Sequence, residues 1–321
     1  MIHRRRFLAL CAIAPGASAA HAQAFPRRAV RLVIPFTPGG ANDVIGRVVA
    51  AQLGEFWGQQ VIVENKGGAS GNIGSEAVAR SDPDGHTILF APTSFAINPF
   101  LYPSAGYDPV ADFAPVTMLC VLPNIMVVPN SSPAKNVREF IAYAKEKKGA
   151  LSFASAGAGS GLHLAGEMFK RMAGVEMAHV PYRGGGQSIN DLVPGRVDVM
   201  FNAMASTLPL VEAGELRALA VTTARRARVV PDLPTIAESG LPGFDMSSWF
   251  ALFVPARTPP DVVAKLNADT IRALATPMVK TALEKLGADI VGSTSAELAA
   301  TVKTTADKWG PIIREAGIRA E

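Results

Sequence analysis

The chain has 321 residues, 49% of them hydrophobic and 18% charged, and its 31 basic and 27 acidic residues give a formal net charge of +4. Arg4, Arg5 and Arg6 lie in an N-terminal segment that we expect to be removed, and without them 28 basic residues face 27 acidic ones, a charge of +1. A charge so close to zero excludes the broad basic surface on which nucleic-acid binding depends.

The first residues have the pattern of an export signal. Three arginines precede a short apolar run, Phe7–Ala14, and a stretch of small residues ends in Ala20-His-Ala-Gln-Ala24. This order is typical of a cleaved secretory signal peptide, which we assign to residues 1–24, and the apolar run is too short to span a bilayer. Arg4 and Arg5 fit the twin-arginine export route as well as the general secretory route, so both routes stay open. We expect the mature protein in the periplasm.

Short β-branched runs alternate with longer amphipathic stretches along the rest of the chain. Strands are predicted at 30–34, 61–63, 87–90, 125–128, 151–153, 197–201, 216–221 and 250–254. Helices are predicted at about 43–56, 75–80, 137–147, 162–172, 261–274, 278–286 and 295–309. Strands that alternate with helices indicate α/β units with largely parallel sheets, and the length of the mature chain indicates two domains.

Two loops of small residues each follow a strand and precede a helix. The first is Pro35–Asn42 and the second is Ala154–Gly161, about one domain length later. Glycine and alanine let the backbone approach a ligand closely, and the N-terminus of the next helix attracts anions through its free N–H groups and its dipole. Two such loops at one cleft would suit a carboxylate. The alternative, that each loop is only a tight connection, stays open.

Other polar residues have two interpretations. Thr93, Ser94 and Asn202 follow predicted strands and can reach the same cleft edge. His163 either donates to a carboxylate or caps its helix, and Arg183 either clamps a carboxylate or is a solvated loop residue. His179, in a β-rich run, is predicted to be a core histidine with satisfied hydrogen bonds.

The sequence contains no nucleophile elbow, phosphate-binding P-loop, dinucleotide fingerprint or zinc motif. We therefore predict a binding protein that uses no metal and no cofactor. A secreted hydrolase or isomerase that acts on a small acid stays the alternative, because a catalytic triad can assemble from distant residues. A secreted adhesion module is a third hypothesis, and it predicts no saturable binding of small molecules.

A series of short motifs resembles the Bug-type receptors, which are the periplasmic solute-binding proteins of tripartite tricarboxylate transporters. In chain order the motifs include Val33–Asp43, Gly71–Gly74, Asp82–Gly85, Ala96–Pro99, Phe153–Gly157, His163–Glu167, His179–Tyr182, Leu216–Thr222 and Gly240–Phe244. They cover essentially all of the mature chain. Each motif is weakly specific by itself, whereas the ordered set is specific.

The resemblance implies a fold, a ligand and a partner. The fold would be the two-lobed α/β architecture of type II periplasmic binding proteins, with a mostly parallel sheet in each lobe, flanked by helices, and the ligand cleft between the lobes. Lobe 1 would comprise residues 25–124 and 226–321, and lobe 2 residues 125–225. The ligand would be a di- or tricarboxylate, an acidic amino acid or an aromatic carboxylate. The lobes would close around it, and a monomeric receptor would deliver it to the membrane components of the transporter.

The resemblance also places the ligand site, in which backbone amides and ordered water of the two loops would hold a carboxylate. The predicted ligand-binding residues are Phe36, Thr37, Gly39, Gly40, Asn42, Asp43, Thr93, Ser94, Ser155, Ala156, Gly159, Ser160, His163, Tyr182, Arg183 and Asn202. Asn202 departs from the family pattern, which commonly has Asp there. The loop Asn65–Ser70 lacks a proline often found in the family, and we expect it to form only the rim of the cleft.

Overall fold

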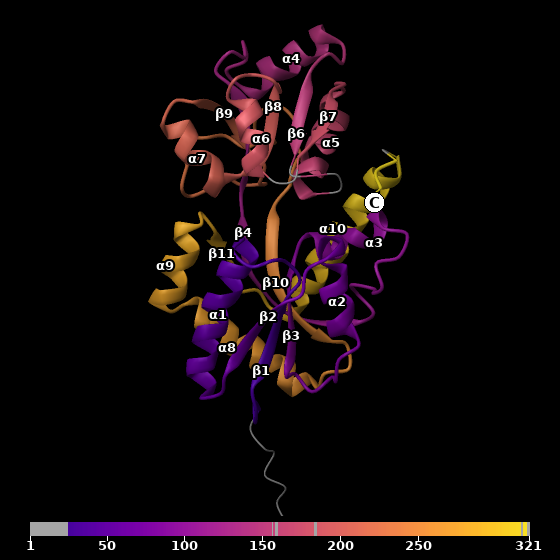
Figure 1. Cartoon of the computed structure of the whole chain (residues 1–321), viewed down its shortest axis with the longest axis vertical. Coiled ribbons are helices and arrows are strands. Elements are labelled where there is room, and N and C mark those ends of the chain that lie inside the picture. The colour runs from indigo at the N-terminus through magenta and orange to yellow at the C-terminus, as the bar shows by residue number, and fades with distance from the viewer. Residues whose placement is uncertain (1–24, 156, 158–159, 183–184, 316, 320–321) are drawn as a thin grey trace, which may run out of the picture.

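A computed structural model describes residues 25–155, 157, 160–182, 185–315 and 317–319. The predicted signal peptide therefore lies outside the described residues. The chain forms two lobes, one above the other in Figure 1, and each lobe is a β-sheet covered by helices. Within the described residues, no helix is long and apolar enough to cross a membrane.

Lobe 1, the lower lobe in Figure 1, contains a six-stranded sheet in the order β11-β4-β10-β3-β1-β2. Its strands are β1 (Val30–Ile34), β2 (Val61–Asn65), β3 (Thr87–Pro92), β4 (Phe113–Leu122), β10 (Ser248–Pro255) and β11 (Asp289–Ile290). Side chains alternate between the faces of a strand. Accordingly Leu32 and Ile34 join one core cluster, whereas Val33 joins another on the opposite face.

Helices cover both faces of this sheet. One face carries α1 (Ala41–Trp57), α8 (Pro260–Leu274) and α9 (Pro277–Lys285), and the other carries α2 (Asn72–Ala79), α3 (Ser94–Leu101) and α10 (Ser295–Glu315). A short 3-10 turn, η1 (Ala69–Gly71), precedes α2.

Lobe 2, the upper lobe, contains a five-stranded sheet in the order β7-β6-β8-β5-β9. Its strands are β5 (Asn124–Pro129), β6 (Ser152–Ser155), β7 (Ala178–Pro181), β8 (Val199–Ala203) and β9 (Leu216–Val221). Its helices are α4 (Val137–Lys147), α5 (Gly161–Ala173), α6 (Gly185–Leu192) and α7 (Met204–Glu212). A reciprocal cap starts α4, because Asn136 accepts from the amide of Glu139 and the Glu139 carboxylate accepts from the amide of Lys135.

The α/β class and the two-lobed fold predicted from the sequence are confirmed, and both sheets are mixed. In lobe 1, β10 pairs antiparallel with β3 and β4, and in lobe 2, β5 pairs antiparallel with β8 and β9. These are the first strands that the chain forms after it passes from one lobe to the other. Such a strand begins at the junction of the lobes and runs away from it, whereas its neighbours in the sheet run toward the junction.

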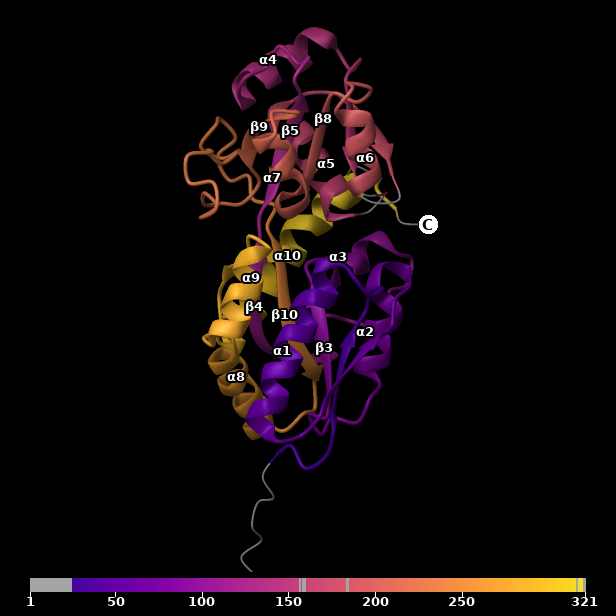
Figure 2. The same cartoon turned by 60° about the vertical axis from the view of Figure 1, so that its left-hand side comes forward.

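The lobes are joined by more than the crossing segments. The core cluster of lobe 2 includes Ile97 of α3 and Trp309 of α10, so apolar packing continues from one lobe into the other. Arg171 of α5 also forms an ion pair with Glu315 at the end of α10. Figure 2 shows α10 rising behind β10 toward the upper lobe.

Candidate functional site

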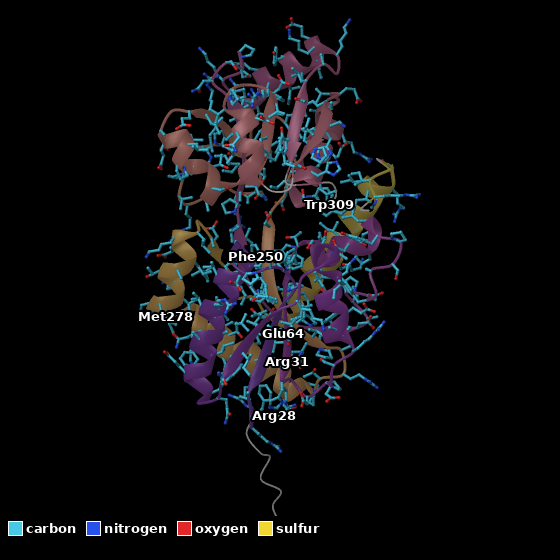
Figure 3. All side chains as sticks on the ribbon, in the orientation of Figure 1. Arg28, Arg31, Glu64, Phe250, Met278 and Trp309 are labelled. Carbon is cyan, nitrogen blue, oxygen red and sulfur yellow. The ribbon has the colours of Figure 1, made fainter. Side chains whose placement is uncertain are left out.

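A cavity of about 340 Å³ lies between the lobes, at the ends of strands β1, β3 and β6. Its polar lining residues are Asn42, Ser70, Thr93, Ser94, Ser160 and Ser248. Its apolar lining residues are Phe36, Pro92, Ile97, Leu164, Met246 and Phe250, and Gly161 completes the set. Figure 3 places Phe250 near the junction of the lobes. Among the described residues, the lining contains no charged side chain.

Two helix N-termini, one from each lobe, meet at this cavity. Helix α1 begins after Gly40, which has no side chain that could cap the first turn. Helix α5 begins after Ser160, whose Oγ accepts from the amide of His163 at 3.2 Å. Each N-terminus presents free N–H groups and a partial positive charge. Together they form an anion site that needs no lysine or arginine.

Asn42 adds an unsatisfied polar atom to the cavity wall. Its Oδ1 is buried and has no hydrogen-bond partner in the described part of the protein. Leaving a buried polar atom unpaired costs about 1–3 kcal/mol, and native proteins rarely do so without water or a ligand. We therefore expect a bound molecule or ordered water at Asn42.

Asp43 anchors the first loop from behind. The residue is 6% exposed, and its carboxylate accepts from Gly39 N at 3.0 Å, Arg47 Nε at 3.0 Å and Asn65 Nδ2 at 2.9 Å. The hydrogen bond from Arg47, with smaller contributions from Asn65 and Gly39, lowers the pKa of Asp43 to about 2 against the opposing effect of burial. Asn65 also donates to the carbonyl of Phe36 at 3.1 Å. Asp43 is thus occupied with the loop and does not line the cavity.

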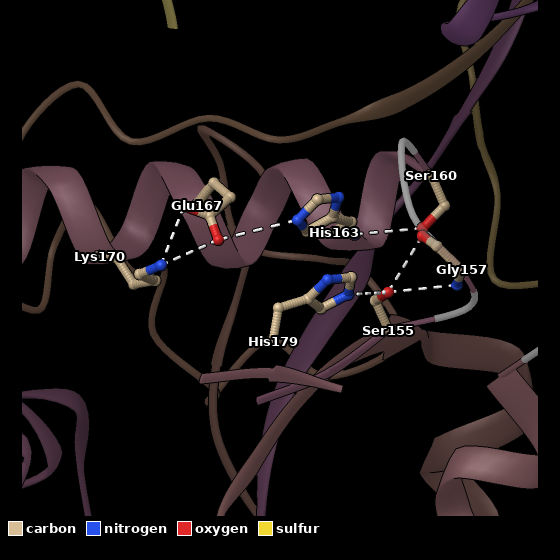
Figure 4. A network of polar contacts seen from close by, with 7 residues as sticks. All are labelled: Ser155, Gly157, Ser160, His163, Glu167, Lys170 and His179. Atoms are coloured by element: carbon tan, nitrogen blue, oxygen red, sulfur yellow. Dashed lines mark hydrogen bonds and ion pairs between the residues drawn. The ribbon is translucent and has the colours of Figure 1, made fainter. Parts of the chain in front are cut away.

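Ser155 and His179 anchor the second loop (Figure 4). Ser155 is fully buried, and its Oγ lies 2.7 Å from Nε2 of His179. The same Oγ lies 3.1 Å from both the amide nitrogen and the carbonyl oxygen of Gly157. Gly157 has a φ of +128°, a conformation open to glycine and rare for other residues. Like Asp43, Ser155 holds the loop and is absent from the cavity wall.

An aromatic stack supports His179. Its ring lies parallel to that of His163, with centroids 3.7 Å apart, and 4.8 Å from that of Phe153. Burial and the neighbouring His163 lower the pKa of His179 to about 4. One turn farther along α5, Glu167 Oε1 lies 3.7 Å from His163 Nε2 and accepts from Lys170 at 3.0 Å. Both histidines that the sequence presented as isolated residues therefore belong to one cluster.

A third segment reaches the cavity at Ser70, in the loop that the sequence predicted to be only a rim. Ala69 and Ser70 have φ angles of +46° and +53°, which side-chain-bearing residues rarely adopt. Asn98 of α3 donates to the Ser70 carbonyl at 3.0 Å, and Tyr102 donates to Ser70 Oγ at 2.7 Å. These contacts hold the strained turn against the cavity.

The structure brings five of the predicted residues to the cavity wall, namely Phe36, Asn42, Thr93, Ser94 and Ser160. Thr37, Gly39 and Gly40 are exposed in the adjoining loop. Asp43, Ser155 and His163 lie behind the loops, as described above. Ala156, Gly159 and Arg183 lie outside the described residues.

Two predicted residues have other partners. Tyr182 donates to Asp191 at 2.8 Å, and buried Asn202 donates to Thr207 at 2.9 Å. The sequence reasoning missed Met246, Ser248 and Phe250, which approach the cavity from the segment that returns to lobe 1. No motif marked that segment as part of the site.

A second cavity of about 370 Å³ lies beyond Thr93 and Met246, against α10 and Trp249. It includes neither helix N-terminus, so the 340 Å³ cavity is the better candidate site. No group of three or more His, Cys, Asp or Glu residues within the described ranges could hold a metal ion.

Comparison with known proteins assigns a family. Residues 45–318 match the family model described as "Tripartite tricarboxylate transporter family receptor". A curated relative from Pseudomonas sp. (strain P51), named "UPF0065 protein in tcbD-tcbE intergenic region", is 42% identical over 323 residues. That alignment covers 99% of this chain and 96% of the relative.

Solved structures resemble the whole described chain. The protein Rpa4515 of R. palustris, solved with adipate, is 37% identical, and the match covers 92% of this chain and 99% of that one with a TM-score of 0.79. The periplasmic binding protein BugD is 35% identical, and the match covers 92% of this chain and 100% of that one with a TM-score of 0.76.

Proposed function

Because this chain belongs to the tripartite tricarboxylate transporter receptor family, we propose that it binds a small carboxylate between its lobes and delivers it to the membrane components of such a transporter. The receptors of this family are solute-binding proteins and not enzymes, so the hydrolase alternative has no support. The resemblance to Bug-type receptors is confirmed by the family match and by BugD.

One observation carries the proposal, namely that two helix N-termini from different lobes meet at one cavity whose described lining holds no charged side chain. A carboxylate there would accept hydrogen bonds from both lobes at once. Its binding energy would therefore favour the closed arrangement of the lobes. A neutral amide of the same shape would leave buried donors unpaired, which gives the site its selectivity.

We propose distinct roles for the predicted site residues. Phe36, Asn42, Thr93, Ser94 and Ser160 would contact the ligand, together with Ser70, Ser248 and the backbone at Gly39 and Gly40. Asp43, Ser155 and His163 would support the loops. We retain Ala156, Gly159 and Arg183 as proposed ligand contacts, with Arg183 as the cation for a second anionic group.

We further propose that lobe 1 comprises residues 25–124 and 226–321, that lobe 2 comprises residues 125–225, and that the lobes close about the crossing segments. The family and its periplasmic relative BugD support a periplasmic location. Export would use residues 1–24 as a cleaved signal, and the mature receptor would be a monomer.

Thermal unfolding of residues 25–321 against a panel of carboxylates tests this function. The panel contains adipate, malate, glutamate and benzoate, each paired with its amide. A ligand at about 100 times its Kd stabilises the folded state by about 2.7 kcal/mol, which raises the Tm by roughly 2–4 °C per kcal/mol. We expect a shift with at least one acid and none with its amide. Equal Tm shifts with an acid and its amide would contradict the proposal. So would the absence of a Tm shift with every acid of the panel, if the protein had been shown to be free of ligand.

A further inference from the structure

A relay of hydrogen bonds connects the second loop to the stacked histidines (Figure 4). The amide of Gly157 donates to Ser155 Oγ at 3.1 Å, and Ser155 Oγ lies 2.7 Å from Nε2 of His179. The ring of His179 lies within 7° of parallel to that of His163. Neither Ser155 nor His179 lines the cavity, so the relay acts on the loop from behind.

We propose that His179 is a positioning residue for ligand capture. Its neutral imidazole holds Ser155, Ser155 holds Gly157, and the loop thereby keeps the N-terminus of α5 turned toward the cavity. This inference rests on the proposed function, because it assumes that the N-terminus of α5 binds the carboxylate.

Two acceptors compete for the hydroxyl proton of Ser155. A serine hydroxyl donates one hydrogen bond, and its two possible acceptors are Nε2 of His179 at 2.7 Å and the carbonyl of Gly157 at 3.1 Å. We assign the proton to the shorter contact, so that Ser155 donates to His179. The oxygen lone pairs then remain free to accept from the Gly157 amide. In the proposed relay Nε2 of His179 is therefore unprotonated.

The surroundings of His179 favour the neutral ring. Phe153 of β6 and His163 of α5 both pack against it, and its ring is closer to His163 than to Phe153. Glu167 and Lys170, also on α5, face the pair and form an ion pair with each other. A proton on Nε2 would reverse its hydrogen bond with Ser155 and place a positive charge beside His163 and Lys170. Because water stabilises that charge better than the stack does, acid favours opening of the relay.

Amide hydrogen exchange at Gly157 in the ligand-free receptor tests the relay without any ligand. We expect faster exchange in Ser155→Ala, which removes the acceptor, and in His179→Phe, which keeps a ring in the stack but removes Nε2. The matched control is Ser152→Ala, at the other end of β6. Its hydroxyl donates to Asp198 at 3.1 Å, at the start of β6 and away from Ser155. Unchanged exchange at Gly157 in both test variants, confirmed as folded, would overturn the proposal.

Adipate affinity, measured by calorimetry, tests the consequence for capture. One lost hydrogen bond predicts a Kd about threefold to tenfold higher for Ser155→Ala and for His179→Phe near neutral pH. The double variant should be no worse than either single variant, because both changes break the same chain of bonds. Effects that multiply would show that the two residues act separately and would overturn the relay.

The pH profile separates positioning from a purely structural role. The ratio of the His179→Phe Kd to the wild-type Kd cancels the protonation of adipate itself, and we expect it to fall toward one as the pH drops to about 4, where the wild-type relay opens. His179→Gln offers an uncharged acceptor to Ser155, so it should restore near-wild-type affinity at neutral pH and exceed the wild type in acid. A ratio independent of pH would overturn the proposal. If no acid of the panel, adipate included, bound the wild type, the result would count against the proposed function instead, and the exchange rates at Gly157 would test the relay.

Discussion

The two loops at the cavity perform the same task with different chemistry. The first is held by an ionised carboxylate, because Asp43 accepts from Gly39, Arg47 and Asn65. The second is held by neutral groups, the hydroxyl of Ser155 and the imidazole of His179. Each anchor fixes its loop from behind and leaves the cavity wall free of charge.

The difference shows how a receptor can keep a carboxylate next to buried acidic and basic groups. Asp43 would repel a bound carboxylate if its charge reached the cavity. Arg47 and Asn65 occupy its oxygens, and its place in the first turn of α1 is favourable for a negative charge. The neutral anchor of lobe 2 avoids this repulsion, but it depends on His179 staying unprotonated.

Replacing the charged anchor should have the largest effect. In Asp43→Asn, an amide group would face the donors of Gly39, Arg47 and Asn65, and at least one donor would lose its acceptor. We expect a loss of about 2 kcal/mol in the free energy of unfolding and a Kd about 30-fold higher for the carboxylate ligand. Urea unfolding and calorimetry measure these two quantities.

The matched control is Asp307→Asn, which breaks an exposed ion pair with Lys303 on α10. Surface pairs of this kind contribute about 0–1 kcal/mol, so both quantities should stay near the wild type. If Asp43→Asn behaved like this control, the first loop would not depend on charge.

A packing change in α5 should disturb the neutral anchor. A Cβ added to Gly166 of α5 would lie 2.1 Å from Cε2 of Phe153, so the ring would have to move and disturb His179. We expect Gly166→Ala to lower the free energy of unfolding by about 1–3 kcal/mol.

Gly54→Ala in α1 is the control, because its Cβ would lie 3.4 Å from its nearest contact, the carbonyl of Gln59. Alanine should be neutral there or stabilise the helix by about 0.5–1 kcal/mol. Urea unfolding compares the two variants. Equal stabilities would contradict a tight contact between α5 and Phe153.

The sequence could predict the loops but not their anchors. Strong periodicity placed β1, β9 and α4 at the bounds that the structure has. The motifs also located both loops. That Ser155 lies behind the loop and not on the cavity wall depends on His179, which a parallel neighbouring strand brings beside it. Such a contact follows from tertiary packing and leaves no local pattern.

Short or interrupted elements were missed for a related reason. Helix α3 has only eight residues and contains Pro99, and β4 contains Pro115, so propensity argues against both. Yet α3 supplies Ser94 and Ile97 to the cavity, and its Asn98 supports Ser70. Burial in the core of lobe 1 decides their structure, and a single sequence does not display that burial.

The sharpest separation of the two anchors should come from mild acid. The pKa of His179 is lowered from 6.5 to about 4, so the unfolded chain binds the proton more readily than the folded one. The contribution of neutral His179 to the free energy of unfolding is therefore fully present above about pH 6.5, and it is lost as the pH falls toward 4. The pKa of Asp43 is lowered from 3.8 to about 2, so its contribution to the free energy of unfolding is lost only below about pH 3.8.

Unfolding free energies measured between about pH 7 and 4.5 should decline less steeply in His179→Phe than in the wild type, while Asp43→Asn should keep the wild-type slope. The opposite assignment of slopes would mean that the charged loop, and not the neutral one, responds first to acid.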